Sequence, residues 1–86
     1  MPCISEFFGI VIAMYYDDHS PPHFHALYAG EEARIRIDTL EVIDGVFPRR
    51  ALALTLEWAC LHREELRADW ERARHHRPLA TIPPLD

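Results

Sequence analysis

The sequence has few of the features that mark secreted and membrane proteins. It contains only two cysteines, Cys3 and Cys60, which are far apart, so we expect free thiols in a reducing compartment. Its apolar run over residues 7–14 is too short to span a bilayer, and Glu6 precedes it where a signal peptide carries positive charge. We therefore expect a cytoplasmic protein with no membrane association.

Several catalytic signatures are also absent. The chain has no glycine-rich phosphate loop, no nucleophile elbow and no C-x-x-C pair, and its two serines, Ser5 and Ser20, have no triad context. These absences leave histidine, arginine and carboxylate side chains as the residues able to carry chemistry.

The composition is that of a small globular domain. In 86 residues, 49% are hydrophobic and 27% are charged, which predicts one folded domain over residues 1–86. A chain of this size buries only a modest core, so a homodimer or a partner chain would add stability. The net charge of -5 repels polyanions, so RNA binding would need a local basic patch.

The hydrophobic pattern predicts an α+β fold. We expect a small antiparallel sheet of three or four strands within residues 7–44, one long C-terminal helix over about 48–76 packed across one face, and an extended tail over 78–86. The expected strands cover residues 7–16, 23–28, 33–37 and 40–43, with Asp44-Gly45 as a turn. Pro48 suits a helix start, and Ile82 and Leu85 could anchor the tail.

The stretch from residue 17 to residue 25, DDHSPPHFH, contains half of the histidines of the chain. Pro21 and Pro22 deny helix to this segment and direct it into an extended strand. His23 and His25 then lie on one side of that strand, with Phe24 on the other. This pattern predicts a pair of imidazoles on a sheet face above a packed core.

One interpretation of this face is an anion site. If the strand registers agree, Arg34 and Arg36 join His23 and His25, and Tyr15 lies nearby, which makes a positive patch able to bind phosphate, carboxylate or RNA. A histidine could then act as general acid or base, with an arginine stabilising phosphate charge. The alternative is a solvated strand face with histidines hydrogen-bonded to their neighbours.

A second interpretation is a metal site. His23 and His25, with His19 or Asp17 from the preceding turn, could supply three or four ligands for zinc or another divalent ion. The alternative for Asp17 and Asp18 is a capped turn, in which each carboxylate accepts hydrogen bonds from nearby backbone N–H groups.

A smaller group of polar residues lies in the predicted helix. Trp58 and His62 share one side of a helix, as do His62 and Glu65, and Glu57 lies next to the tryptophan. This group is a candidate binding site. The alternative is a packed tryptophan beside a partly exposed histidine.

The string Pro-Pro-His-Phe-His-Ala over residues 21–26, with Glu57-Trp58 and His62, resembles the bacterial domain of unknown function 4160 family. The resemblance implies that the family pattern includes Pro22, His23, His25, Glu57, Trp58 and His62. It also implies that the chain is one component of a toxin–antitoxin-like two-gene module, encoded beside a second small protein, often of the domain-of-unknown-function-2442 type. A non-enzymatic interaction module with structural histidines and a small metal-binding protein remain the alternatives.

Overall fold

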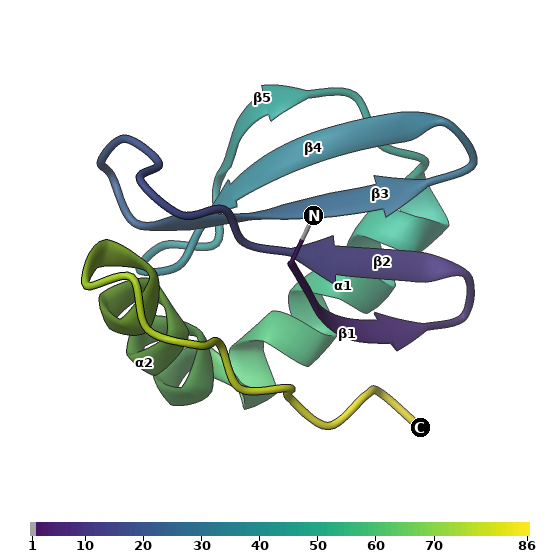
Figure 1. The fold of residues 1–86 in the computed structure, drawn as a ribbon. Helices are drawn as coiled ribbons and strands as arrows, with labels where there is room; N and C mark the ends of the chain where they lie inside the picture. The colour runs from purple at the N-terminus through teal and green to yellow at the C-terminus, as the bar shows by residue number, and fades with distance from the viewer. Residues whose placement is uncertain (1) are drawn as a thin grey trace.

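The computed structural model describes residues 2–86 and contains one antiparallel sheet and two helices. The strands follow one another in the order β1-β2-β3-β4-β5, and Figure 1 shows α1 passing behind the strands and α2 below their left-hand ends. The elements are β1 (Cys3–Phe7), β2 (Ile10–Ala13), β3 (His23–Tyr28), β4 (Glu31–Arg36), β5 (Val42–Gly45), α1 (Arg49–Leu61) and α2 (Arg63–Arg74). The α+β class is confirmed, but the sheet has five strands rather than three or four.

The additional strand comes from the N-terminal apolar run. Residues 7–16 do not form one strand, because the chain reverses at Phe8 and Gly9, which both have positive φ (50° and 79°). Strand β1 therefore begins at residue 3 rather than 7. It pairs with β2, and Phe7 lies opposite Ile10 next to the turn. An aromatic residue in the turn makes the two strands look continuous in the sequence.

The central hairpin agrees with its prediction. Strand β3 covers residues 23–28, and Ala29-Gly30 forms the tight turn into β4. The fourth predicted strand is present as β5, but it extends through Asp44 and Gly45, which pair with β4 instead of forming a turn. The sheet therefore ends in an exposed edge strand.

The predicted single helix is wrong, because the chain breaks at His62, which has φ of -119° and ψ of 26°. A straight helix over residues 48–76 would be about 43 Å long at 1.5 Å per residue. The longest extent of the molecule is 33 Å, so such a helix would run past the sheet. The break lets α1 cross the sheet while α2 turns under the end where β3 begins (Figure 1). Within residues 2–86, no helix has the length and apolar character needed to cross a membrane.

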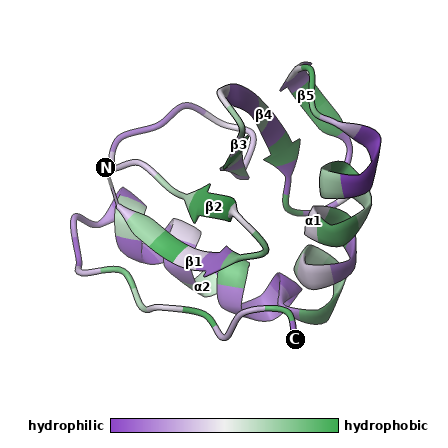
Figure 2. Ribbon diagram, turned by 90° about the vertical axis from the view of Figure 1, so that its right-hand side faces the viewer, coloured by the Kyte–Doolittle hydropathy of each residue, from purple (hydrophilic) through white to green (hydrophobic). Residues whose placement is uncertain are grey.

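The core lies between the sheet and the helices. Trp58 and Leu66 are completely buried against one face of the sheet, and Figure 2 shows hydrophobic residues along β2 and recurring on α1. The sheet contributes Ile10, Ile12, Phe24, Ala26, Ile35 and Ile37 to this core. The tail is anchored by buried Ile82, whose N–H donates to Ile4, and by the indole N–H of Trp58, which donates to the carbonyl of Pro83.

We expect Gly45→Ala to destabilise the protein more than Gly30→Ala. Both glycines have positive φ (95° and 82°), so each alanine adds backbone strain of about 1 kcal/mol. A Cβ at position 45 would also fall inside contact distance of the backbone carbonyl oxygen of Glu32, whereas a Cβ at position 30 has nothing within 4 Å. Urea unfolding should give a loss of about 3 kcal/mol for Gly45→Ala. Equal losses for the two variants would contradict the close approach of β5 to β4.

Candidate metal centre

The structure places His23 and His25 beside the two arginines of the neighbouring strand. His23 lies directly opposite Arg36 and His25 directly opposite Arg34 in the register of β3 and β4. Residues directly opposite in an antiparallel pair point to the same side of the sheet. The four side chains therefore emerge on the face away from α1, as the sequence suggested.

Both imidazole rings are nevertheless buried, unlike the open face that we expected. His23 is 2% exposed and His25 is 7% exposed. The ring of His23 lies 5.3 Å from that of Trp70, and the ring of His25 lies edge-on to Tyr15 at 4.5 Å. Two aromatic side chains thus fix the orientation of the pair.

The side chain of Asp18 joins the two rings. Its Oδ2 atom lies 3.0 Å from Nε2 of His23 and 3.0 Å from Nε2 of His25. One ligand atom from each of these three residues lies within 4.8 Å of the others, the arrangement of a candidate metal centre. Neither Asp17 nor His19 belongs to this group.

The remaining ring nitrogens are also held. Nδ1 of His23 lies 2.7 Å from the carbonyl oxygen of Pro21, and Nδ1 of His25 lies 2.9 Å from Oε2 of Glu32. Histidines that bind metal commonly donate their other N–H to a carbonyl or carboxylate in this way, which fixes the tautomer. Both rings therefore have the partners that direct Nε2 toward an ion.

The hydrogen bonds of this cluster require more protons than two neutral imidazoles carry. All four ring nitrogens face oxygens that only accept hydrogen bonds, from Pro21, Asp18 and Glu32. Two neutral imidazoles supply only two N–H donors, so two contacts lack a proton. The cluster is satisfied if both rings are cationic, or if an ion replaces the protons between Nε2 and Asp18.

The distances between ligand atoms fit an ion. Two ligand atoms that each lie about 2.1 Å from a metal are about 3.0 Å apart at a 90° angle and about 3.4 Å apart at a tetrahedral angle. Both distances from Oδ2 of Asp18 to a histidine Nε2 are 3.0 Å. Each pair of Asp18 with a histidine thus fits two adjacent positions of an octahedral ion, and the donor set is that of two-histidine, one-carboxylate sites.

Electrostatics keep Asp18 ionised. Burial raises the pKa of its carboxyl, but hydrogen bonds from His25 and from the backbone N–H of His19, with the charges of His23 and His25, outweigh burial and lower it. The pKa of Tyr15 is raised, first by burial and then by the negative charges of Glu32 and Asp18. Asp18 is therefore available as an anionic ligand beside a protonated phenol.

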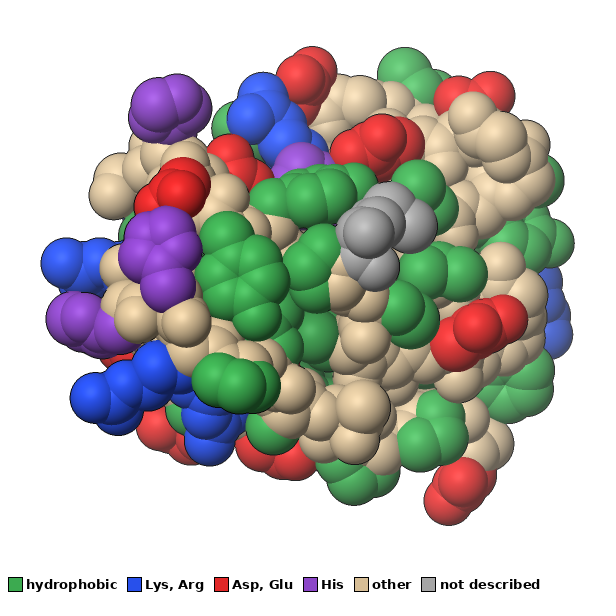
Figure 3. Space-filling model, in the orientation of Figure 1, with side chains coloured by type: hydrophobic (Ala, Val, Ile, Leu, Met, Phe, Trp, Pro, Cys, Tyr) green, Lys and Arg blue, Asp and Glu red, His purple; other side chains and the backbone are tan. Residues whose placement is uncertain are grey.

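Other predicted site residues lie elsewhere. Asp17 pairs with His76 at 2.9 Å, and His19 is exposed on the loop between β2 and β3. Exposed histidines gather on the left of Figure 3, and they are His19, His75 and His76. Arg34 pairs with Asp44 at 2.9 Å, so only Arg36 of the two arginines lacks an acidic partner among residues 2–86.

The candidate binding group of the predicted helix, which includes Trp58 and His62, lies at the break between α1 and α2. Nδ1 of His62 lies 2.6 Å from Oε1 of Glu65, and its ring lies 5.5 Å from that of Trp58. Trp58 is fully buried and Glu57 is exposed. This arrangement agrees with the packed tryptophan beside a partly exposed histidine.

Sequence reasoning missed Asp18 and Glu32 as members of the site. Asp18 was assigned to turn capping, and its Oδ1 does accept the backbone N–H of His19, while Oδ2 reaches the rings. Glu32 could have been placed from the turn at Ala29-Gly30, because a two-residue hairpin sets Glu32 opposite Leu27 and on the histidine face.

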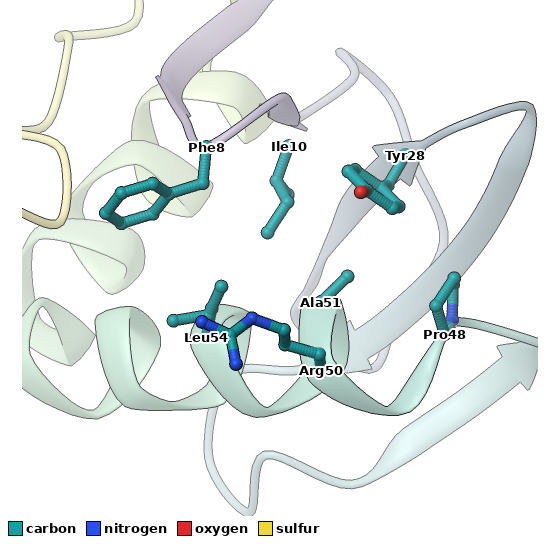
Figure 4. Close-up of a pocket in the computed structure, with 7 residues that line it drawn as sticks. All are labelled: Phe8, Ile10, Tyr28, Pro48, Arg50, Ala51 and Leu54. Carbon is teal, nitrogen blue, oxygen red and sulfur yellow. The ribbon is translucent and has the colours of Figure 1, made fainter.

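A separate apolar groove lies at the other end of the sheet. It has a volume of about 230 Å³ and opens between the turn that joins β1 to β2 and the start of α1. Figure 4 shows that its lining side chains come from both sides, and they are Phe8, Ile10, Tyr28, Pro48, Arg50, Ala51 and Leu54. Phe8 is 58% exposed there.

Comparison with known proteins identifies the family. The model of the family described as "Domain of unknown function (DUF4160)" matches residues 9–71. The chain belongs to this family. No curated protein and no solved structure matches the chain. The matched region contains Asp18, His23, His25 and Glu32, so the whole candidate centre lies within the family domain.

We expect the contribution of Asp18 to the stability of the metal-free protein to be lost at low pH. Folding lowers the pKa of Asp18, so its ionised form stabilises the protein above its unfolded-state value of about 4. That contribution is lost as the pH falls through the folded-state pKa. The difference in unfolding free energy between wild type and Asp18→Asn, measured by urea from pH 7 to acid, should shrink below about pH 4. A constant difference would contradict the lowered pKa.

Proposed function

We propose that the protein binds a divalent metal ion through His23, His25 and Asp18. The observation that carries this proposal is the convergence of two Nε2 atoms on one carboxylate oxygen, at 3.0 Å each. The second ring nitrogen of each histidine is already bonded to a carbonyl or carboxylate, so neither ring needs to rotate to accept an ion.

The number of ligands supports an exchangeable site rather than a closed structural one. Structural zinc sites usually have four protein ligands, whereas sites that bind water or substrate keep positions open. Three nitrogen and oxygen ligands suit zinc, iron, manganese or cobalt. A free general-base role for His23 or His25 has less support, because every nitrogen of both rings is engaged.

Direct RNA binding by the histidine and arginine face also has less support. Asp18, Glu32 and Asp44 bring three carboxylates to the region that holds Arg34 and Arg36. An open polyanion site would need a surplus of cations there. We place the protein in the cytoplasm, in keeping with two free, exposed thiols at Cys3 and Cys60.

The metal proposal is tested with untagged protein treated with a chelator. Titration with Co(II) and Zn(II), followed by absorption and calorimetry, should show one ion per chain. Asp18→Asn should weaken binding by about 100-fold or more, because it removes an anionic ligand. Asp17→Asn is the matched control, since Asp17 is the adjacent acid but pairs with His76.

The outcome for Asp17→Asn decides the assignment. Wild-type affinity in this variant, with a folded circular dichroism spectrum for both variants, supports the triad. Equal loss in the two variants, or no stoichiometric ion in the wild type, would end the proposal.

A second candidate function is protein interaction, in a toxin–antitoxin-like two-gene module. The groove between the β1–β2 turn and α1 favours it, because it is mostly apolar and presents exposed Phe8 beside Arg50. The partner would be the second small protein encoded alongside, of the domain-of-unknown-function-2442 type. Exposed Val42 and Ile43 offer the β5 edge as another contact surface, for a partner or a second copy.

We expect Phe8→Asn to weaken co-purification with the neighbouring gene's product. Asparagine tolerates the positive φ at position 8, so the turn is kept while the apolar contact is lost. Val46→Asn, which changes an exposed apolar residue outside the groove lining, is the control. Failure of the wild-type pair to co-purify would contradict this second function.

A further inference from the structure

Arg36 is the unusual cation near the candidate centre. It lies directly opposite His23 on the same face of the sheet, so the two Cβ atoms are about 5 Å apart. Its side chain is half-buried, and its Nε atom is buried with no hydrogen-bond partner. Among residues 2–86, no carboxylate lies within ion-pair distance of its guanidinium.

The other arginine of the strand shows what Arg36 lacks. Arg34 points to the same face two residues earlier, and its guanidinium is bonded to Asp44. A buried guanidinium N–H without a partner is costly, so such a donor is often completed by a ligand. The Nε atom of Arg36 is such a donor, on the residue directly opposite His23.

We propose that the bound ion and Arg36 together hold a phosphate monoester group, an inference that rests on the proposed metal site. One phosphate oxygen would occupy an open position of the ion. The others would accept hydrogen bonds from the planar guanidinium, which matches two oxygens at once. Metal ions and arginines commonly share phosphoryl oxygens in this way.

The number of oxygens that the site can bind selects the class of ligand. Asp18 and Glu32 together offset the two charges of the ion, Asp44 offsets Arg34, and Arg36 leaves about one positive charge for an anion. A phosphate monoester has three terminal oxygens, one for the ion and two for the guanidinium, whereas a carboxylate or an internal phosphodiester has only two.

The test uses the full chain loaded with one equivalent of Co(II), which reports ligand exchange through its visible absorption. Inorganic phosphate should perturb this spectrum in the wild type and should broaden the phosphorus NMR signal. Arg36→Gln should weaken phosphate binding by about tenfold, since it removes a charge-assisted pair of hydrogen bonds. Arg34→Gln removes one positive charge from the same strand face and should bind phosphate like the wild type.

The outcomes separate this inference from the metal proposal. Absence of bound Co(II) would refute the metal site itself. Bound Co(II) whose spectrum does not respond to phosphate would overturn only the phosphate site. Equal weakening in Arg36→Gln and Arg34→Gln would show general charge attraction, and acetate binding as strongly as phosphate would overturn the assignment of the ligand class.

Discussion

The carboxylate of Asp18, held between the two imidazoles of β3, is the interaction on which the functional end of the molecule depends. Its Oδ2 atom contacts Nε2 of both His23 and His25, and its Oδ1 atom accepts the backbone N–H of His19. One side chain therefore fixes the loop between β2 and β3 against the strand that follows it. The same carboxylate provides the negative charge that a divalent ion would require at this position.

The rest of the fold supports this arrangement from three directions. The β3–β4 hairpin brings Glu32 to Nδ1 of His25, and the carbonyl of Pro21 holds Nδ1 of His23. The break at His62 turns α2 under this end of the sheet, so that Trp70 reaches the His23 ring. The aromatic and hydrogen-bonding partners leave the rings little rotational freedom, which is the preorganisation that a binding site requires.

Sequence patterns predicted those strands and turns whose structure depends only on residues close together in the chain. Period-two alternation gave β3 and the buried Ile35 of β4, and the Ala29-Gly30 turn set the register that brings Arg36 opposite His23. The β1–β2 turn was missed because Phe8 is a poor turn residue. The helix break was missed because nothing at His62 resembles a helix terminator. A straight helix over residues 48–76 would be longer than the 33 Å extent of the molecule, and sequence propensity does not register that limit. Asp18 was assigned to a cap because one-dimensional spacing does not show which way a loop carboxylate points.

The most direct test of this account is to locate the bound ion in a crystal structure. Crystals of the untagged protein soaked with Zn(II) or Co(II) would be measured at the absorption edge of the metal. We predict a single strong anomalous peak about 2.1 Å from Nε2 of His23, Nε2 of His25 and a carboxylate oxygen of Asp18. An empty triad with both rings still bonded to Asp18, or a peak only at the exposed histidines of the surface, would show that the cluster is structural.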